Sequence, residues 1–338
     1  MPRSVRIEFP GAVYHVMCRG DRREPIFVDD DDRTVMIETL AQTCSRTGFR
    51  IHGFVLMPNH YHLLLETPEA NLVAGMKWFQ GTYTQRYNRR HRQCGHLFQG
   101  RYKAVPVEAE DASQFKTVSD YIHLNPARAR LLDTSNPDLA RFAWSSFPEF
   151  SGGGPLPEWL VRARVFASNG LPDEGRGSCR RYSALMALRV REVLALSESN
   201  ETVEEWKRLR RGWYLGSDRF RDRLMDKADA LLRGKKRASY RDDGMKMHDE
   251  REAGRLLQRA LDILNVSLPS VWAMRQTDVV KQAIAWWLKS RTVVGDAWLC
   301  EKLEMGSRTN ISRAVAAYRG CADKQRKQLK EKLYACAD

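Results

Sequence analysis

Two short segments of the chain contain residues that could break a phosphodiester bond. His60 and His62 are two positions apart in a strand-like run, so their imidazoles share one face of the strand. Further along, Tyr121 and Asn125 are four positions apart, which is about one turn of a helix. Two imidazoles and an amide oxygen could bind a divalent metal, and a phenol could act as the nucleophile. The expected chemistry is metal-assisted attack by tyrosine on a phosphodiester.

The identity of the metal follows from the donor atoms. Two nitrogens and one oxygen suit Mn²⁺, and also Mg²⁺ if water and phosphate oxygens complete the coordination. Zn²⁺ is the alternative, because two histidines and one oxygen also resemble a catalytic zinc site.

Each of these residues also has a purely structural interpretation. The two histidines could be hydrogen-bonded near a core, and Tyr121 could be a core residue. Asn125 precedes Pro126, and could simply end a helix or cap a turn. His15 on the first strand could support the metal ligands or be a core histidine.

The charge of the chain favours a polyanionic partner, because its 338 residues carry a formal net charge of +14. The stretch 70–107 contains no Asp or Glu, and aromatic residues alternate with its basic ones. Positive side chains neutralise phosphates and rings stack on unpaired bases, which predicts contact with single-stranded or hairpin nucleic acid. The candidate contacts are Lys77, Arg86, Arg89, Arg90, Arg92, Arg101 and Lys103.

Apolar periodicity predicts strands over 13–19, 50–57, 61–66 and 97–107. Helices are expected from the Asp-rich segment 29–32 to Gly48, over 71–92, and from Asp111 through Tyr121. The resulting order, β-α-β-β-α-β-α, predicts a ferredoxin-like α+β fold with an antiparallel sheet and helices on one face.

The segment 151–155 (SGGGP) is the clearest break in the chain, so we expect a first domain over 1–150. Residues 151–245 then form a helical region of unknown role, and 246–338 an all-α domain. In this last domain, a short helix over 296–303, a turn at 306–307 and a second helix over 309–319 predict a helix-turn-helix. Contact with duplex DNA is expected there, with Arg313 as a contact residue.

Four ordered motifs carry a family resemblance: PGAVYHV at 10–16, MPNHYH at 57–62, FQGRYK at 98–103 and YIHLNP at 121–126. The first 150 residues resemble the single-tyrosine HUH transposases, specifically the REP-associated tyrosine transposases. The resemblance implies the HUH endonuclease fold, with His60, His62 and Asn125 as metal ligands and Tyr121 as the nucleophile that forms a 5′-phosphotyrosine. It also implies single-stranded DNA as substrate, cut near hairpins of repeated extragenic palindromes.

The chain continues well beyond the end of shorter family members. Its segment 281–319 resembles the helix-turn-helix of replication-initiator proteins. The leading hypothesis is therefore a metal-dependent DNA endonuclease and strand transferase. The alternative is a DNA-binding regulator that uses the helix-turn-helix and keeps the first domain as a non-catalytic hairpin-binding module.

The remaining expectations concern location and assembly. No run approaches 18 apolar residues and no signal peptide is recognisable, which predicts a cytoplasmic protein without a membrane span. The 7 cysteines include no C-x-x-C pair, so reduced thiols are expected. A monomer and a homodimer both stay open.

Overall fold

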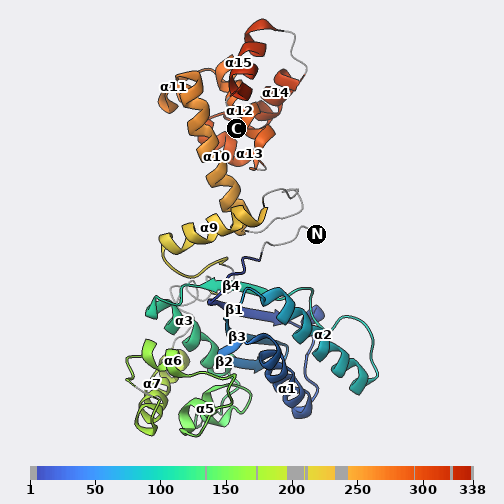
Figure 1. The fold of residues 1–338 in the computed structure, drawn as a ribbon, viewed down its shortest axis with the longest axis vertical. Coiled ribbons are helices and arrows are strands. Elements are labelled where there is room, and N and C mark those ends of the chain that lie inside the picture. The colour runs from blue at the N-terminus through green and yellow to red at the C-terminus, as the bar shows by residue number, and fades with distance from the viewer. Residues whose placement is uncertain are drawn as a thin grey trace. The chain divides into compact units, whose positions relative to one another are not determined.

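The computed structural model describes residues 6–133, 135–172, 174–195, 209, 212–232, 243–292, 294–319 and 323–335. Contacts between residues divide the chain into two units, one spanning Arg6–Leu224 and one that begins at Met225. Figure 1 shows a sheet with surrounding helices in the first unit and helices alone in the second. Each unit is described by itself.

A four-stranded antiparallel sheet forms the centre of the first unit. Its strands are β1 (Ala12–Arg19), β2 (Arg50–Met57), β3 (His60–Thr67) and β4 (Lys103–Val107), in the order β2-β3-β1-β4. This order is that of the ferredoxin-like fold. The predicted α+β class, with a helical region after it, is confirmed.

The last strand is shorter than the predicted 97–107. Gly100 has a φ of +74°, in the left-handed region, which is incompatible with an extended strand. Residues before Lys103 instead fold back near the end of β1, where Gln99 N–H donates to the Arg19 carbonyl at 2.9 Å.

Helices α1 (Asp30–Thr47) and α2 (Leu72–His91) form a layer on one face of the sheet. α1 begins at an Asp29 cap that accepts a hydrogen bond from Asp32 N–H. α2 packs on Tyr61, whose ring lies 5.7 Å from that of Phe79 and whose hydroxyl accepts a hydrogen bond from Gln80. Helix α1, between β1 and β2 in the chain, and helix α2, between β3 and β4, therefore share one face of the sheet, as predicted.

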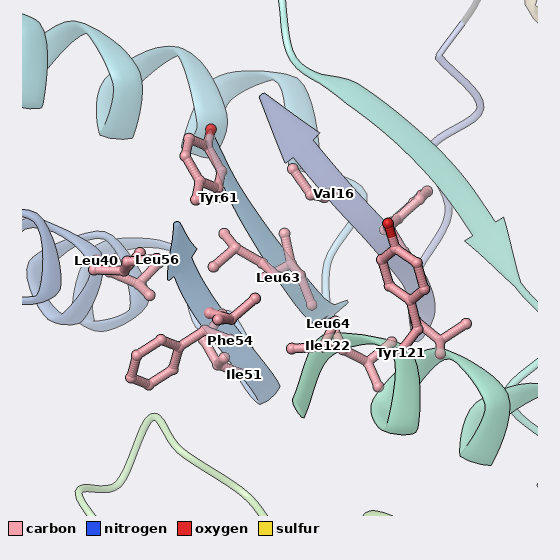
Figure 2. Packing of buried hydrophobic residues seen from close by; sticks show 14 of the residues in the cluster. Val16, Leu40, Ile51, Phe54, Leu56, Tyr61, Leu63, Leu64, Tyr121 and Ile122 are labelled. Carbon is pink, nitrogen blue, oxygen red and sulfur yellow. The ribbon is translucent and has the colours of Figure 1, made fainter. Parts of the chain in front are cut away.

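Helix α3 (Ala112–His123) lies on the opposite face, which corrects the expectation that all the helices share one side. The ring of its Tyr121 is 5.3 Å from that of His62, the strand neighbour of Tyr61 that points the other way. Figure 2 shows Tyr121 and Ile122 projecting from α3, with Leu64 of β3 beside Ile122. The physical reason is apolar patterning: successive residues Leu63, Leu64 and Leu65 are all fully buried, so both faces of the sheet need cover.

The first unit continues beyond the glycine-rich break, so the boundary expected at residue 150 does not coincide with the division between the two units. Backbone pairing holds the later chain to the sheet edges. Val161 N–H donates to the Ile51 carbonyl at 2.8 Å beside β2, and Leu215 N–H donates to the Pro106 carbonyl at 2.9 Å beside β4. The other helices described in the first unit are α4 (Asn125–Arg128), α5 (Phe147–Gly152), α6 (Ala163–Ser168) and α7 (Arg176–Ala195), with 3₁₀ turns at Asp21–Arg23 and Leu139–Arg141.

The second unit is helical throughout its described residues. Its core surrounds α12 (Val279–Arg291), where Trp287 is almost completely buried. The predicted helix pair is present as α13 (Asp296–Leu303) and α14 (Arg308–Arg319), joined by a turn in which Glu304 and Gly306 have φ values of +48° and +72°. The helices from α9 onward are α9 (Asp218–Leu232), α10 (Asp243–Leu264), α11 (Leu268–Ala273), α12 (Val279–Arg291), α13 (Asp296–Leu303), α14 (Arg308–Arg319) and α15 (Lys324–Ala335). No helix among the described residues is long and apolar enough to cross a membrane.

Candidate functional site

One pocket collects all four residues for which we predicted chemistry. It lies on the sheet face that α3 covers, where His60 and His62 of β3 meet Tyr121 and Asn125. Strand β1 passes beside the histidines, with Arg19 opposite His60 and Met17 opposite His62. The pocket is lined by Met17, Cys18, Arg19, His60, His62, Gln99, Arg101, Lys103, Tyr121, Asn125, Arg128 and Ala129.

Two short helices in succession place Tyr121 and Asn125 on the same pocket wall. α3 ends at His123 and α4 begins at Asn125, and Leu124 between them keeps helical dihedral angles. Pro126 is tolerated because it occupies the first turn of α4, where a missing N–H leaves no bond unmade. Asn125 thus neither ends α3 nor caps a turn, since Leu124 takes the capping position; it is the first residue of α4 and lines the pocket.

Both histidines are oriented by hydrogen bonds at Nδ1. His60 Nδ1 lies 2.8 Å from Asn59 Oδ1, which accepts, so that His60 nitrogen carries the proton. His62 Nδ1 lies 2.9 Å from His15 Nε2. Since Nδ1 is engaged in each ring, Nε2 is the atom with which each histidine would bind a metal.

His15 is a core histidine that also contacts His62. Its ring is fully buried and stacks on His62 with centroids 5.1 Å apart. Burial lowers the pKa of His15 to about 3, so the ring is neutral near neutral pH. The Leu209 backbone lies near and opposes that effect, but Nδ1 makes no hydrogen bond of normal geometry with the described residues. His15 is therefore a neutral support for His62.

Tyr121 is held between rings and a cation. Its side chain is 5% exposed, and its ring lies 5.3 Å from that of His62 and 5.5 Å from that of His15. The guanidinium of Arg128 lies 4.7 Å from the centroid of the Tyr121 ring. Sequence reasoning missed Arg128, although its position seven residues after Tyr121 matches two helical turns. A cation there adds positive charge where a phosphodiester would have to bind.

The donor atoms fit a divalent metal of the harder kind. Asn125 is 6% exposed, and its buried Nδ2 has no hydrogen-bond partner among the residues that the structure describes. A half-turn of the amide exchanges Nδ2 for Oδ1, so a bound cation would satisfy this buried group. Within the described residues no three His, Cys, Asp or Glu side chains gather as a metal site. The candidate set is thus two imidazoles and one amide, without the carboxylate of a typical two-histidine zinc site.

The structure separates the predicted DNA contacts into two groups. Arg101 and Lys103 line the pocket. The others belong to α2 or directly follow it, on the far face of the sheet; they are Lys77, Arg86, Arg89, Arg90 and Arg92.

Two of the α2 arginines are engaged with α1 and the residues that cap it. Arg86 donates hydrogen bonds to Thr39 and Gln42. Arg90 forms ion pairs with Asp29, Asp31 and Asp32 at 2.6, 2.9 and 2.6 Å. These contacts hold the helix layer together; of the predicted DNA contacts, Arg101 and Lys103 are the two that line the pocket with Tyr121.

Arg313 lies in the second unit, on α14. Its side chain is exposed, while Ile311, Ala314 and Tyr318 of the same helix are buried in the core. The residue is therefore on the outer face of the second helix of the predicted pair.

A ferredoxin-like sheet on which two strand histidines meet a tyrosine of the covering helix α3 defines a candidate DNA-processing site. Residues 9–125 match the family model described as IS200-like transposases. This match confirms, for that segment, the resemblance carried by the four sequence motifs.

Other comparisons are weaker. A search of curated protein sequences gives no significant match. A solved REP-associated tyrosine transposase bound to a REP hairpin is similar at 15% identity, covering 48% of this chain and 92% of that one, with a TM-score of 0.38. A putative transposase from Deinococcus radiodurans R1 is similar at 20% identity, covering 34% and 92%, with a TM-score of 0.26. The last two scores are too low to carry further argument.

Proposed function

We propose that the protein is a metal-dependent endonuclease and strand transferase for single-stranded DNA, with Tyr121 as its nucleophile. The observation that carries the proposal is the convergence of His60, His62, Tyr121 and Asn125 in one basic pocket. The match of residues 9–125 to the IS200-like transposases supports the same reaction class.

The proposed reaction conserves the energy of the bond that is cut. The Tyr121 oxygen attacks the phosphorus, the bond to the 3′-oxygen breaks, and a 5′-phosphotyrosine and a 3′-hydroxyl result. Attack by a 3′-hydroxyl on the phosphotyrosine reverses the step and joins strands. Arg101, Lys103 and Arg128 line the space that the phosphate would occupy and would bind its oxygens.

The cofactor that suits this pocket is Mn²⁺ or Mg²⁺. His60, His62 and Asn125 would hold the ion through two ring nitrogens and an amide oxygen. When bound, it would polarise the phosphate and stabilise the departing oxygen. His15 and Asn59 would keep the ring nitrogens in the required orientation.

The proposed substrate is a single strand that carries a hairpin of a repeated extragenic palindrome. The family motifs support this choice, as does the basic pocket. For the second unit we propose contact with duplex DNA through α14, because Arg313 is exposed there.

The test uses a hairpin-bearing oligonucleotide labelled on either side of its cleavage site. With Mn²⁺, we expect the purified protein to release the strand that ends in a 3′-hydroxyl and to retain the 5′-phosphate side as an adduct on a denaturing gel. Tyr121→Phe and chelation should each abolish the adduct. Tyr87→Phe is the matched control, because Tyr87 lies on α2 on the other face of the sheet. Full cleavage by Tyr121→Phe would refute the assignment of the nucleophile.

The second candidate function is a DNA-binding regulator, which the exposed Arg313 on α14 favours. It predicts that the full-length protein binds duplex DNA but forms no adduct with any divalent metal. Arg313→Ala would then remove the binding of duplex DNA, which is the only activity that a regulator would have in this assay. If that variant still forms the adduct on a hairpin, the enzyme proposal is favoured.

A further inference from the structure

Helix α7 contacts the nucleophile helix on both sides of Tyr121. It follows the segment that matches the transposase family, and it belongs to the same structural unit as the sheet. Its contacts are made to Asp120, directly before Tyr121, and to His123, two residues after it.

The first contact is an ion pair with little exposure to solvent. Arg189 of α7 approaches Asp120 with Nη1 and Oδ1 2.6 Å apart, and Lys116 lies 2.9 Å from the other carboxylate oxygen. The second guanidinium nitrogen of Arg189 donates to Asn169 Oδ1 at 2.9 Å, which fixes the arginine itself. Burial raises the pKa of Asp120, and the two cations oppose that effect. Removing Arg189 would therefore leave a largely buried carboxylate with only Lys116.

The second contact passes through a buried histidine. His123 Nδ1 lies 2.7 Å from the Tyr182 hydroxyl of α7, and its Nε2 lies 2.7 Å from Ser146 Oγ. Ser146 Oγ in turn accepts a hydrogen bond from Phe54 N–H of β2 at 2.9 Å. Burial lowers the pKa of His123 to about 3, so the ring is a neutral link between α7 and the sheet.

We infer that α7 positions the nucleophile by holding α3 at two points. A helix can rotate about its axis and slide along it, and one contact does not prevent both movements. Asp120 and His123 differ by three residues, so they hold one face of α3 at two heights along its axis. Tyr121 lies between them in sequence but projects from another side of α3, so the two contacts set the direction in which it enters the pocket. Arg189 and Tyr182 are positioning residues, since they touch α3 and do not line the pocket.

This inference rests on the proposed function, because its effect is read through attack by Tyr121. The experiment measures the single-turnover rate of adduct formation by the full chain with Mn²⁺ and saturating hairpin DNA. Arg189→Gln removes the ion pair, and Tyr182→Phe removes only the hydroxyl while its ring stays packed on Phe166. The control is Arg180→Gln, which makes the same charge change at an exposed position of α7. Hairpin affinity and the unfolding temperature are measured for each variant.

We expect Arg189→Gln and Tyr182→Phe to slow adduct formation by roughly 10-fold to 100-fold, as small misplacements of reacting groups do. Hairpin affinity should stay within about two-fold of the original protein, because the basic pocket residues are unchanged. Arg189→Lys should recover part of the rate. Arg180→Gln should behave as the original protein.

The failure of this inference is distinguishable from failure of the proposed function. Variants that unfold at a lower temperature but form the adduct at the original rate would show that α7 only stabilises the fold, and the inference would be overturned. An original protein that forms no adduct would instead refute the proposed function. If Arg189→Gln does not fold, Tyr182→Phe decides, because it leaves the core volume almost unchanged.

Discussion

Replacing His15 by phenylalanine tests whether a neutral buried ring prepares His62 to bind metal. The substitution keeps an aromatic ring in a fully buried position and removes the nitrogen that lies 2.9 Å from His62 Nδ1. It removes no charge near neutral pH, because burial lowers the pKa of His15 to about 3. Any loss of affinity would therefore come from the hydrogen bond and the orientation it maintains.

The expected magnitude follows from the cost of an unsatisfied buried group. Loss of the partner of a buried polar atom costs about 1–3 kcal/mol, which corresponds to roughly 5-fold to 160-fold in an equilibrium constant. Removal of a residue that orients a metal ligand typically weakens metal binding by about the same factor. The Kd for Mn²⁺ of His15→Phe should exceed that of the original protein by a factor in this range. The Kd of His15→Gln should lie between those of the original protein and His15→Phe if the glutamine amide reaches His62.

Calorimetric titration of the full-length protein with Mn²⁺, without DNA, measures this effect directly. His96→Phe is the control, since His96 is exposed and lies outside the pocket. A His15→Phe protein that unfolds cooperatively but binds Mn²⁺ as tightly as the original protein would refute the role of His15. An equal loss of Mn²⁺ affinity in His15→Phe and His96→Phe would show that the effect does not depend on His62.

Two further predictions concern charge. Arg101→Ala should weaken hairpin binding and reduce its salt dependence by about one phosphate contact, because Arg101 lines the pocket. Arg90→Ala should leave hairpin binding unchanged and lower the unfolding temperature, because Arg90 is paired with Asp29. Fluorescence anisotropy over a salt series measures hairpin binding, and thermal unfolding measures stability. The pKa of the Glu66 carboxyl is lowered from its ordinary value of 4.5, because the carboxylate accepts a hydrogen bond from His52. Ionised Glu66 therefore stabilises the fold at pH values above 4.5, and this stabilisation is lost as the pH falls through the lowered pKa. Urea unfolding at a series of pH values should therefore show a smaller acid-induced loss for Glu66→Gln, and an unchanged pH profile would contradict this.

Local pattern predicted the four strands and first three helices of the first unit, although it began the last strand too early, and it predicted the geometry of the residue pairs within these elements. Alternation along a strand is a property of the backbone, so the common face of His60 and His62 follows from their spacing. Four residues make about one helical turn, so Tyr121 and Asn125 could be placed on one side of a helix. What spacing did not predict was that strand and helix would meet, which required the family motifs.

Contacts between distant segments explain what the sequence could not predict. Periodicity shows that α3 has an apolar face but not which face of the sheet it covers. The stretch 70–107 contains no acidic residue, yet Arg90 is paired with aspartates that precede it by many positions. Local composition cannot show such pairing, which is why α2 looked like a DNA surface. The hydrogen bond between His15 and His62 and the contacts of α7 with Asp120 and His123 are likewise long-range.

The proposed donor set implies that a metal ion and DNA would bind cooperatively. Two imidazoles and one amide carry no negative charge, and no carboxylate appears among the described residues that line the pocket, whereas Arg101 and Lys103 do. A divalent cation is therefore attracted only weakly until a DNA phosphate adds negative charge.

Such coupling must be reciprocal at equilibrium. With Tyr121→Phe to prevent cleavage, hairpin DNA should lower the Kd for Mn²⁺, and Mn²⁺ should lower the Kd for the hairpin by the same factor, about 5-fold to 100-fold. Titration of each ligand with and without the other measures both factors. If DNA left the Mn²⁺ affinity unchanged, the phosphate would not complete the charge of the site, and the negative charge required by the metal would have to come from the protein.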